Sequence, residues 1–350
     1  MALPVILVTR QLPLKVLNQL TMHGHVVMWE PDCPVTREWL LDHISRAEAL
    51  YCLLTDSIDR DVILLGKRLR VISSMSVGVD HIDVAACTNR GIPVGHTPGV
   101  LTETTADLAF GLLMAAARRI EEGAGYVRQG RWTTWSPDLL LGRDIYGATL
   151  GIIGFGRIGQ AVARRALGFN MKVLVAQVSR SRPKEGSPIP SPGMNVTDTF
   201  HQWTWHESLE SGEVKPAPIS DVLTKSDFLS LHVPLTDDTC HMIGANELRT
   251  MKPTAILVNT ARGGVVETEA LYLALKEGII GAAALDVTDP EPLPASHPLL
   301  SLSNCLVIPH LGSATVATRG RMALMAAENV IAGLKGDHLP YCINPHVYDA

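Results

Sequence analysis

The chain has 350 residues, 46% of them apolar and 19% charged, and its formal net charge is −5. This composition is typical of a globular protein, and the length predicts two domains because a single core rarely grows beyond about 250–300 residues. The chain has no long basic run and no apolar stretch long enough to span a bilayer, so we expect no nucleic-acid or membrane partner. Its six cysteines lack C-x-x-C spacing, which predicts reduced thiols, a cytoplasmic location and no metal site.

The first hundred residues alternate short β-branched runs with helical patterns. Strands are predicted at Val5–Thr9, Ala49–Thr55 and Val71–Met75, and helices at Pro13–Gly24, Arg37–Ser45 and Asp59–Leu65. Strands that alternate with helices indicate a parallel, doubly wound sheet.

A long apolar helix is predicted from about Glu103 to Glu121, and a second α/β series follows it. The helix is apolar on nearly every face, which indicates burial between domains or at a subunit interface. The strands of the second series are predicted at 150–153, 172–176, 228–232, 255–260, 281–287 and 305–309, and a final helix at 316–334. We therefore expect an α/β protein with two doubly wound parallel-sheet domains.

The run from Leu150 to Gln160 carries a G-x-G-x-x-G motif between a buried strand and a helix. Gly154 permits a tight turn, Gly156 lets a ligand approach the backbone, and Gly159 lets the helix pack closely on the strand. The free N–H groups at the start of such a helix can bind a pyrophosphate. With this strand and helix around it, the motif predicts a Rossmann-type dinucleotide site rather than a plain strand–helix turn.

The second strand of this domain indicates which dinucleotide is bound. An NAD-type domain has an acidic residue near the end of that strand for the ribose 2′-hydroxyl. Here the strand Lys172–Gln177 has no carboxylate at its end, and Ser179, Arg180 and Arg182 follow it. Because arginine and serine suit a 2′-phosphate, we expect NADPH to be preferred and NADH to be possible. The alternative is that these residues only begin a solvated loop.

A long insertion is predicted at about 183–219, in a stretch rich in Pro, Ser and Gly. It is far longer than the usual connection between a strand and a helix. Two interpretations stay open: the insertion covers the adenosine end of the cofactor, or it is a mobile loop.

Three later segments place polar side chains just after predicted strands, where open α/β sheets bind ligands. Arg262 follows one strand and can hold a carboxylate with two parallel hydrogen bonds. Glu291 lies in a proline-stiffened loop, and His310 follows the last strand. Singly, these residues could be an ion-pair partner, a solvated acid and a structural histidine. Together with a dinucleotide turn, they indicate a catalytic site.

The chain resembles the D-isomer-specific 2-hydroxyacid dehydrogenase family over nearly its whole length, and within it the glyoxylate/hydroxypyruvate reductases. The resemblance is carried by the glycine turn and by the segments Met75–His81, Thr97–Pro98, Thr102–Ala106, Arg131–Trp135, Asn259–Gly264, Asp286–Leu293 and Pro309–Thr315. It implies an enzyme that reduces glyoxylate, and hydroxypyruvate as well, by hydride transfer from NAD(P)H.

The resemblance also implies the roles of the domains and of the catalytic residues. Residues 1–99 and 317–350 would form a flavodoxin-like substrate-binding domain and residues 100–316 the Rossmann-type NAD(P)-binding domain, with catalysis in the cleft. Arg262 would bind the carboxylate of a small 2-keto acid and polarise its keto oxygen. His310 would donate a proton to that oxygen, and Glu291 would orient the imidazole and favour its charged form.

Further binding residues follow from the same resemblance. The substrate would be bound by Val77, Gly78, Arg262, His310, Ser313 and, from the other chain of a homodimer, Trp135. The cofactor would be bound by Gly154, Gly156, Arg157, Ile158, Gly159, Ser179, Arg180, Arg182, Pro234, Thr260, Asp286 and Gly312. Asp286 would lie near the nicotinamide carboxamide and Pro234 near the adenosine. For Trp135, ordinary packing at the subunit interface is the alternative.

Two other functions are compatible with the sequence. One is another enzyme of the family, such as a D-lactate or a phosphoglycerate dehydrogenase, although the regulatory domain of the longer phosphoglycerate enzymes is not expected after residue 340. The other is a non-catalytic protein of the same fold that senses dinucleotides and binds a partner. Absence of turnover with every 2-keto acid would favour this second function.

Overall fold

The computed structural model describes residues 3–177 and 213–349, and it divides the chain into two compact units. The first unit comprises Met1–Leu101 with Ala314–Ala350, and the second comprises Thr102–Ser313. These boundaries lie close to those placed at 99/100 and 316/317 from the sequence, while the roles of the two units remain a prediction. No helix in the described ranges is long and apolar enough to cross a membrane.

The first unit contains a parallel sheet of five strands in the order β2-β1-β3-β4-β5, which is the order of flavodoxin-like domains. The strands are β1 (Val5–Val8), β2 (His25–Met28), β3 (Ala49–Cys52), β4 (Val71–Ser74) and β5 (Val94–Gly95). The three strands predicted in this region, now β1, β3 and β4, are confirmed. The patterns missed β2, which is only half-buried, and β5, which has only two residues.

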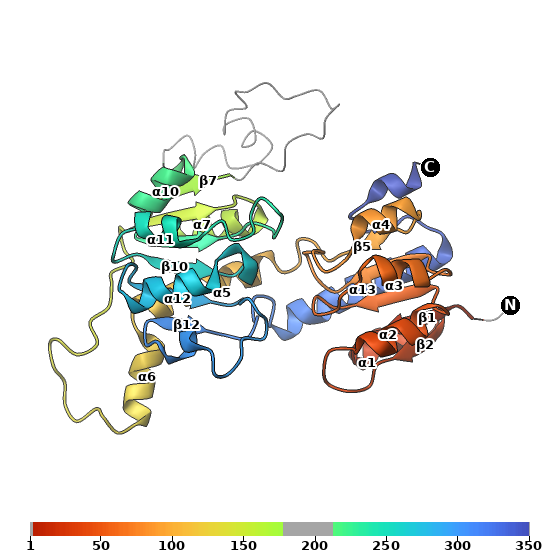
Figure 1. The fold of residues 1–350 in the computed structure, drawn as a ribbon, viewed down its shortest axis with the longest axis horizontal. Coiled ribbons are helices and arrows are strands. Elements are labelled where there is room, and N and C mark those ends of the chain that lie inside the picture. Colours follow the sequence, from red (N-terminus) through yellow and green to blue (C-terminus); the bar gives the residue numbers. More distant parts are fainter. Residues whose placement is uncertain (1–2, 178–212, 350) are drawn as a thin grey trace. The chain divides into compact units, whose positions relative to one another are not determined.

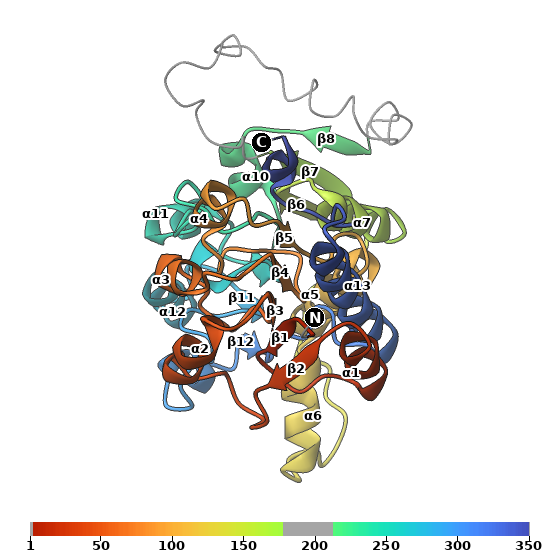
Figure 2. The same cartoon turned by 90° about the vertical axis from the view of Figure 1, so that its right-hand side faces the viewer.

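Helices cover both faces of this sheet, and Figure 2 shows the two groups on opposite sides of the strands. One face packs against α1 (Leu14–Thr21) and α13 (Val316–Lys335), and the other against α2 (Arg37–Ile44), α3 (Arg60–Leu65) and α4 (Val84–Asn89). The hydroxyl of Tyr51 on β3 donates to the Ala323 carbonyl of α13 at 3.2 Å. The C-terminal helix thus completes the core of the N-terminal sheet.

The second unit contains a parallel sheet of seven strands in the order β12-β11-β10-β9-β6-β7-β8. Six of them follow the Rossmann order, and β12 is added at the edge beside β11. The strands are β6 (Thr149–Ile153), β7 (Lys172–Ala176), β8 (Val214–Pro216), β9 (Phe228–Leu231), β10 (Ile256–Asn259), β11 (Ala282–Leu285) and β12 (Cys305–Val307). Asn259, Leu285 and Val307 are in register, so the carboxyl ends of β10, β11 and β12 meet at one edge.

Two apolar cores lie on the two faces of the second sheet, beneath the helices that Figure 1 shows over these faces. α5 (Thr102–Ala117) and α7 (Arg157–Leu167) cover one face, and α10 (Ile219–Lys225), α11 (Ala245–Thr250) and α12 (Thr268–Lys276) cover the other. The predicted fold class, two doubly wound parallel-sheet domains, is therefore confirmed.

The helix predicted over 103–121 is wrong as a single element. α5 ends at Ala117, and a separate helix, α6 (Ile120–Arg128), begins after it. Arg119 between them has a φ angle of +52°, and the N–H of Arg143 donates to the Ala117 carbonyl at 2.7 Å. A distant segment therefore takes a hydrogen bond that a continued helix would have made within itself.

The predicted insertion, 183–219, extends too far at its C-terminal end. Val214–Pro216 form β8, which pairs with β7, and α10 begins at Ile219. Only Val214 of the three β8 residues is buried, so the strand left no apolar pattern in the sequence. Residues 178–212 lie outside the described part of the chain, and with them Ser179, Arg180 and Arg182.

Candidate active site

The glycine turn connects β6 to α7 as predicted. Gly154 has a φ angle of +93°, and a Cβ on it would lie 2.6 Å from the carbonyl oxygen of His232. A Cβ on Gly159 would collide with the carbonyl oxygen of Gly154, so both positions require glycine. Gly156 differs, because a Cβ there would meet no atom within 4 Å. The space beside Gly156, at the start of α7, suits a bound pyrophosphate.

Two polar side chains that no sequence motif indicated lie at this turn. The N–H of Phe155 donates to Oε1 of Gln177, just after β7, at 3.1 Å. Nε2 of His232, just after β9, lies 2.8 Å from Oγ of Ser230, and burial lowers the pKa of this imidazole to about 4. The imidazole is therefore neutral at neutral pH. A single Gln or His at a strand end gives little signal in a sequence, since only the fold brings it to the glycines.

Asn259, the last residue of β10, shapes the turn that carries Arg262. Its Nδ2 donates to the Arg262 carbonyl at 2.8 Å, and its Oδ1 accepts the N–H of Ala261 at 3.0 Å. This turn leaves the Arg262 side chain half-buried. The hydroxyl oxygen of Thr260 is buried and has no hydrogen-bond partner among the described residues. Because an unpaired buried hydroxyl is costly, Thr260 suits a polar contact with a ligand.

His310 and Glu291 form a pair at the same edge of the sheet. Nδ1 of His310 lies 2.6 Å from Oε1 of Glu291, and Oε2 of Glu291 accepts the N–H of Thr288 at 3.2 Å. Burial by itself would raise the pKa of Glu291. The hydrogen bond with His310 and the nearby charges of His310 and Arg262 outweigh burial, so the pKa lies below its ordinary value. Glu291 is therefore ionised at neutral pH and can stabilise a protonated imidazole.

Asp286, directly after β11, binds the turn that carries His310. Its Oδ1 accepts the N–H of Leu311 at 2.5 Å and its Oδ2 that of Gly312 at 2.8 Å. Its backbone carbonyl accepts the N–H of His310 at 2.9 Å. Burial raises the pKa of Asp286 above its ordinary value, against the lowering effects of these N–H donors and of His310. The contact with Leu311 and Gly312 is a finding that the sequence did not predict.

The predicted substrate residues Val77 and Gly78 follow β4 in the first unit. The hydroxyl of Ser76 donates to the Gly78 carbonyl at 2.6 Å, and Nδ1 of His96 lies 3.0 Å from the Val77 carbonyl oxygen. Side chains therefore hold both carbonyls of this short loop. The role of Val77 and Gly78 as substrate ligands remains a prediction.

The other predicted site residues lie in the second unit. Trp135 follows α6, and 76% of it is exposed. Ser313, the last residue of the unit, is half-buried, and Pro234 after β9 is exposed. Arg157 and Ile158 are the first two residues of α7. The contacts of these five residues do not test the binding roles predicted for them.

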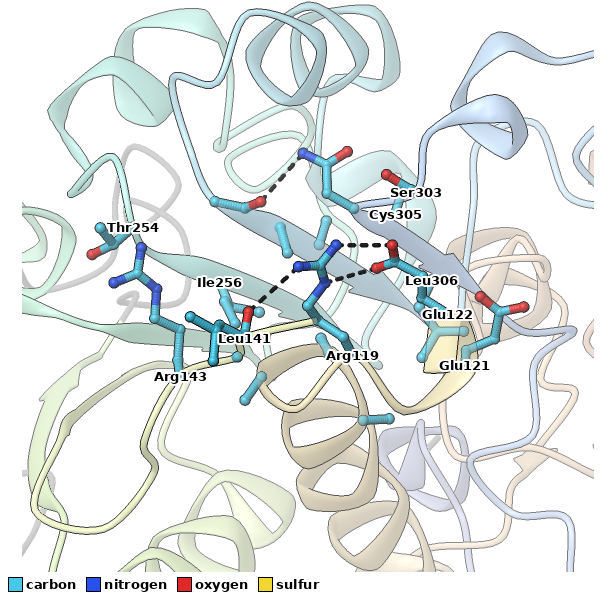
Figure 3. A pocket seen from close by; sticks show the side chains of 18 residues that line it. Arg119, Glu121, Glu122, Leu141, Arg143, Thr254, Ile256, Ser303, Cys305 and Leu306 are labelled. Carbon is cyan, nitrogen blue, oxygen red and sulfur yellow. Dashed lines mark hydrogen bonds and ion pairs between the residues drawn. The ribbon is translucent and has the colours of Figure 1, made fainter. Parts of the chain in front are cut away.

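A pocket of about 300 Å³ opens at the amino ends of the strands of the second sheet (Figure 3). It is lined by Ile256, Ala282 and Cys305, the first residues of β10, β11 and β12, and by Arg119 and Arg143. Arg262, Glu291 and His310 follow the carboxyl ends of these strands, whereas the pocket lies at their amino ends. The pocket is therefore not the predicted site of reaction.

Known proteins match this chain over nearly its whole length. The model of the D-isomer specific 2-hydroxyacid dehydrogenase NAD binding domain matches residues 110–194 and 191–312. The glyoxylate reductase of Korarchaeum cryptofilum is 47% identical over 345 residues, which cover 98% of this chain and 97% of that protein. The glyoxylate reductase of Thermofilum pendens is 45% identical over 349 residues, covering 99% and 96%. The chain belongs to the D-isomer specific 2-hydroxyacid dehydrogenase family.

Solved structures agree with this assignment. A protein from Thermus thermophilus has a TM-score of 0.83 and 44% identity, with 97% of this chain and 99% of that chain covered. An NADPH-dependent glyoxylate/hydroxypyruvate reductase from Sinorhizobium meliloti, in complex with NADP and malonate, has a TM-score of 0.77 and 28% identity, with 98% and 97% covered. The family predicted from the sequence is thereby confirmed.

A 2-hydroxyacid dehydrogenase of this family uses a nicotinamide dinucleotide, and the residues of this chain fit one. The matched NAD-binding domain contains the glycine turn, where the space beside Gly156 and the start of α7 suit the pyrophosphate. The buried hydroxyl of Thr260 supplies a polar group at the neighbouring strand end. Both features lie at the carboxyl edge of the sheet, where this fold binds its ligands.

Proposed function

We propose that the protein reduces glyoxylate, and hydroxypyruvate as well, to the corresponding 2-hydroxy acid with a nicotinamide dinucleotide as the reductant. The observation that carries this proposal is the 2.6 Å contact between Nδ1 of His310 and Oε1 of Glu291, at the carboxyl edge of the dinucleotide-binding sheet. Relatives named glyoxylate reductase, 41% to 47% identical over 98% to 99% of the chain, support the choice of substrate.

Reduction of a 2-keto acid requires a hydride at the keto carbon and a proton at the keto oxygen. The bound cofactor supplies the hydride. His310 supplies the proton from Nε2, because Nδ1 is engaged with Glu291. Glu291 holds the ring and stabilises its protonated form until the proton is transferred. Arg262 binds the substrate carboxylate with parallel N–H donors, and its positive charge polarises the keto C=O bond.

The first unit is proposed to contribute the backbone N–H groups of Val77 and Gly78 to the substrate carboxylate. The support is the organisation of this loop, in which Ser76 and His96 hold the two carbonyls. A loop held in this way can present its N–H groups without reorganising when an anion binds.

NADPH is proposed to be the preferred cofactor, with NADH also accepted. The support is the identity of the residue directly after β7, which is Gln177. Its side-chain oxygen accepts the N–H of Phe155. A carboxylate at this position would repel a 2′-phosphate, and the neutral amide does not. Arg180 and Arg182, outside the described residues, are the proposed partners of the phosphate.

The protein is proposed to work as a homodimer in the cytoplasm. The support for a dimer is a group of exposed apolar side chains on α6 and the segment after it. Among them, Trp132 is 60% exposed, Trp135 76% and Leu141 65%. Exposed apolar groups of this size favour burial against a second protein surface. The six cysteines are all unpaired, as expected for a reducing compartment.

Initial rates test the proposed reaction. Oxidation of the reduced nicotinamide is followed with glyoxylate, hydroxypyruvate and pyruvate, each with NADPH and with NADH. We expect glyoxylate to give the highest kcat/KM and NADPH to exceed NADH. Turnover of pyruvate alone would indicate another dehydrogenase of the family. Dinucleotide binding without turnover of any 2-keto acid would indicate the non-catalytic alternative.

A further inference from the structure

The backbone at His310 has an unusual conformation. Its φ angle is +52°, in the left-handed region that residues other than glycine rarely occupy. Such a conformation persists only where the surrounding structure holds it. The turn therefore requires a group that fixes it, and the neighbouring contacts show which group that is.

Asp286 contacts three consecutive residues of this turn. Its carbonyl accepts the N–H of His310, and its two carboxylate oxygens accept those of Leu311 and Gly312 separately. From α5, the hydroxyl of Thr105 donates to the Gly312 carbonyl at 3.1 Å and holds the far end of the turn. Asp286 is 2% exposed, so these contacts are shielded from water.

The carboxylate suits this task better than other side chains of similar size. Both of its oxygens accept hydrogen bonds, whereas an asparagine offers one acceptor and turns an NH₂ group toward the second N–H. An Asp286→Asn substitution would therefore set two donors against each other at either Leu311 or Gly312. The turn would lose the restraint next to His310 while its volume stayed almost the same.

We propose that Asp286 is a positioning residue for His310: by holding Leu311 and Gly312, it fixes the turn so that the imidazole meets Glu291 and aims at the substrate. This inference rests on the proposed function, in which His310 donates the proton. It adds a second role to the expectation that Asp286 serves the cofactor, because each carboxylate oxygen can accept a further hydrogen bond beside the one from the turn.

A double-mutant cycle tests whether Asp286 acts through His310. We expect Asp286→Asn to lower kcat for glyoxylate, measured at saturating NADPH, by about ten- to a hundredfold, because a small misplacement of a catalytic group can cost about a hundredfold. In a protein that already carries His310→Asn, the same substitution should cost no further activity. If the two losses multiply, the inference is wrong.

Asp56→Asn is the matched control. Asp56 is also a buried carboxylate, 3% exposed, that accepts a backbone N–H, from Leu53 at 2.7 Å, but it lies in the first unit. We expect a lower Tm from this change and no interaction with His310→Asn in the cycle. If Asp56→Asn and His310→Asn showed the same interaction energy as Asp286→Asn and His310→Asn, the cycle would report only general destabilisation.

Two further measurements test the inference if Asp286→Asn does not fold or if the wild-type protein does not reduce glyoxylate. Thr105→Val removes the second restraint on Gly312 and should lower kcat non-additively with His310→Asn, while Thr105→Ser should restore it. Amide exchange at Leu311 and Gly312 should accelerate in Asp286→Asn and not in Asp56→Asn, whether or not glyoxylate is a substrate. Absent wild-type turnover would refute the proposed function, whereas unchanged exchange at these amides would refute the inference.

Discussion

Nδ1 of His310 lies 2.6 Å from Oε1 of Glu291, although 19 residues separate them in the chain. The two side chains lie on loops that follow adjacent parallel strands, β11 and β12. This relationship makes Nε2 the ring atom that can carry a transferable proton, and it places a carboxylate where it stabilises the protonated ring. The pair is thus suited to the role of a general acid.

Glu291→Gln should move the pH profile of the reduction. The lowered pKa of Glu291 keeps its carboxylate charged through neutral pH, so the substitution removes a full negative charge beside His310. Reduction needs the protonated imidazole, and without the neighbouring negative charge this protonated form is less stable. The alkaline fall of kcat/KM for glyoxylate should therefore shift to lower pH, with a small loss of rate in acid and a larger one at neutral pH.

His310→Ala provides the reference for this profile. It should lower kcat by about 10²–10⁴-fold, the usual contribution of a positioned general acid. The profiles of wild type and Glu291→Gln are recorded with the same cofactor. An alkaline fall that stays in place, or moves to higher pH, would show that the charge of Glu291 does not act on His310.

Arg262→Ala should weaken turnover of the keto acid and leave cofactor binding intact. Loss of a charge-assisted hydrogen bond costs about 1.5–3 kcal/mol, so kcat/KM for glyoxylate should fall by about tenfold or more. Arg249→Ala, which removes an exposed arginine on α11, is the control and should change neither parameter. Unchanged kcat/KM in Arg262→Ala would remove this residue from the substrate site.

Arg180→Ala should reduce the preference for NADPH. One charge-assisted hydrogen bond to the 2′-phosphate is worth about 1.5–3 kcal/mol, so KM for NADPH should rise by about one to two decades and KM for NADH hardly at all. Gln177→Glu keeps an acceptor for the N–H of Phe155 and adds a negative charge, so it should act in the same direction. Equal effects of Arg180→Ala on both cofactors would assign Arg180 to the fold or to the pyrophosphate.

A mixed dimer can show whether Trp135 completes the active site of a second chain. One chain carries His310→Ala and the other Trp135→Ala. If the tryptophan is shared, the site with the intact His310 receives Trp135 from the other chain and keeps full activity, giving one active site per dimer. Activity equal to that of a Trp135→Ala homodimer, corrected for one site, would place the tryptophan in its own chain's site. A monomeric protein in solution would contradict the proposed dimer.

The parts of the fold that depend on local pattern were predictable from the sequence. The turn from β6 to α7 needs Gly154 and Gly159 for backbone reasons that involve only nearby atoms, so its motif predicts its shape. Alternation of strands and helices was enough for two parallel sheets. Because parallel strands end at one edge, the positions of Arg262, Glu291 and His310 after strands indicated a common site.

Tertiary structure alone decided the features that join distant segments. α5 ends at Ala117, where the N–H of Arg143 donates to the Ala117 carbonyl. The apolar pattern continued to residue 121 and gave no sign of this contact. β8 becomes a strand by pairing with β7, since its own three residues carry no apolar period.

The same division holds at the candidate active site. The sequence by itself determined which chemical groups this protein has at its strand ends. It did not determine that Asp286 binds the turn 25 residues away that carries His310, or that Gln177 binds the glycine turn at Phe155. Hydrogen bonds of this kind depend on the approach of two chain segments to within about 3 Å, and only the packing of the whole sheet sets that distance.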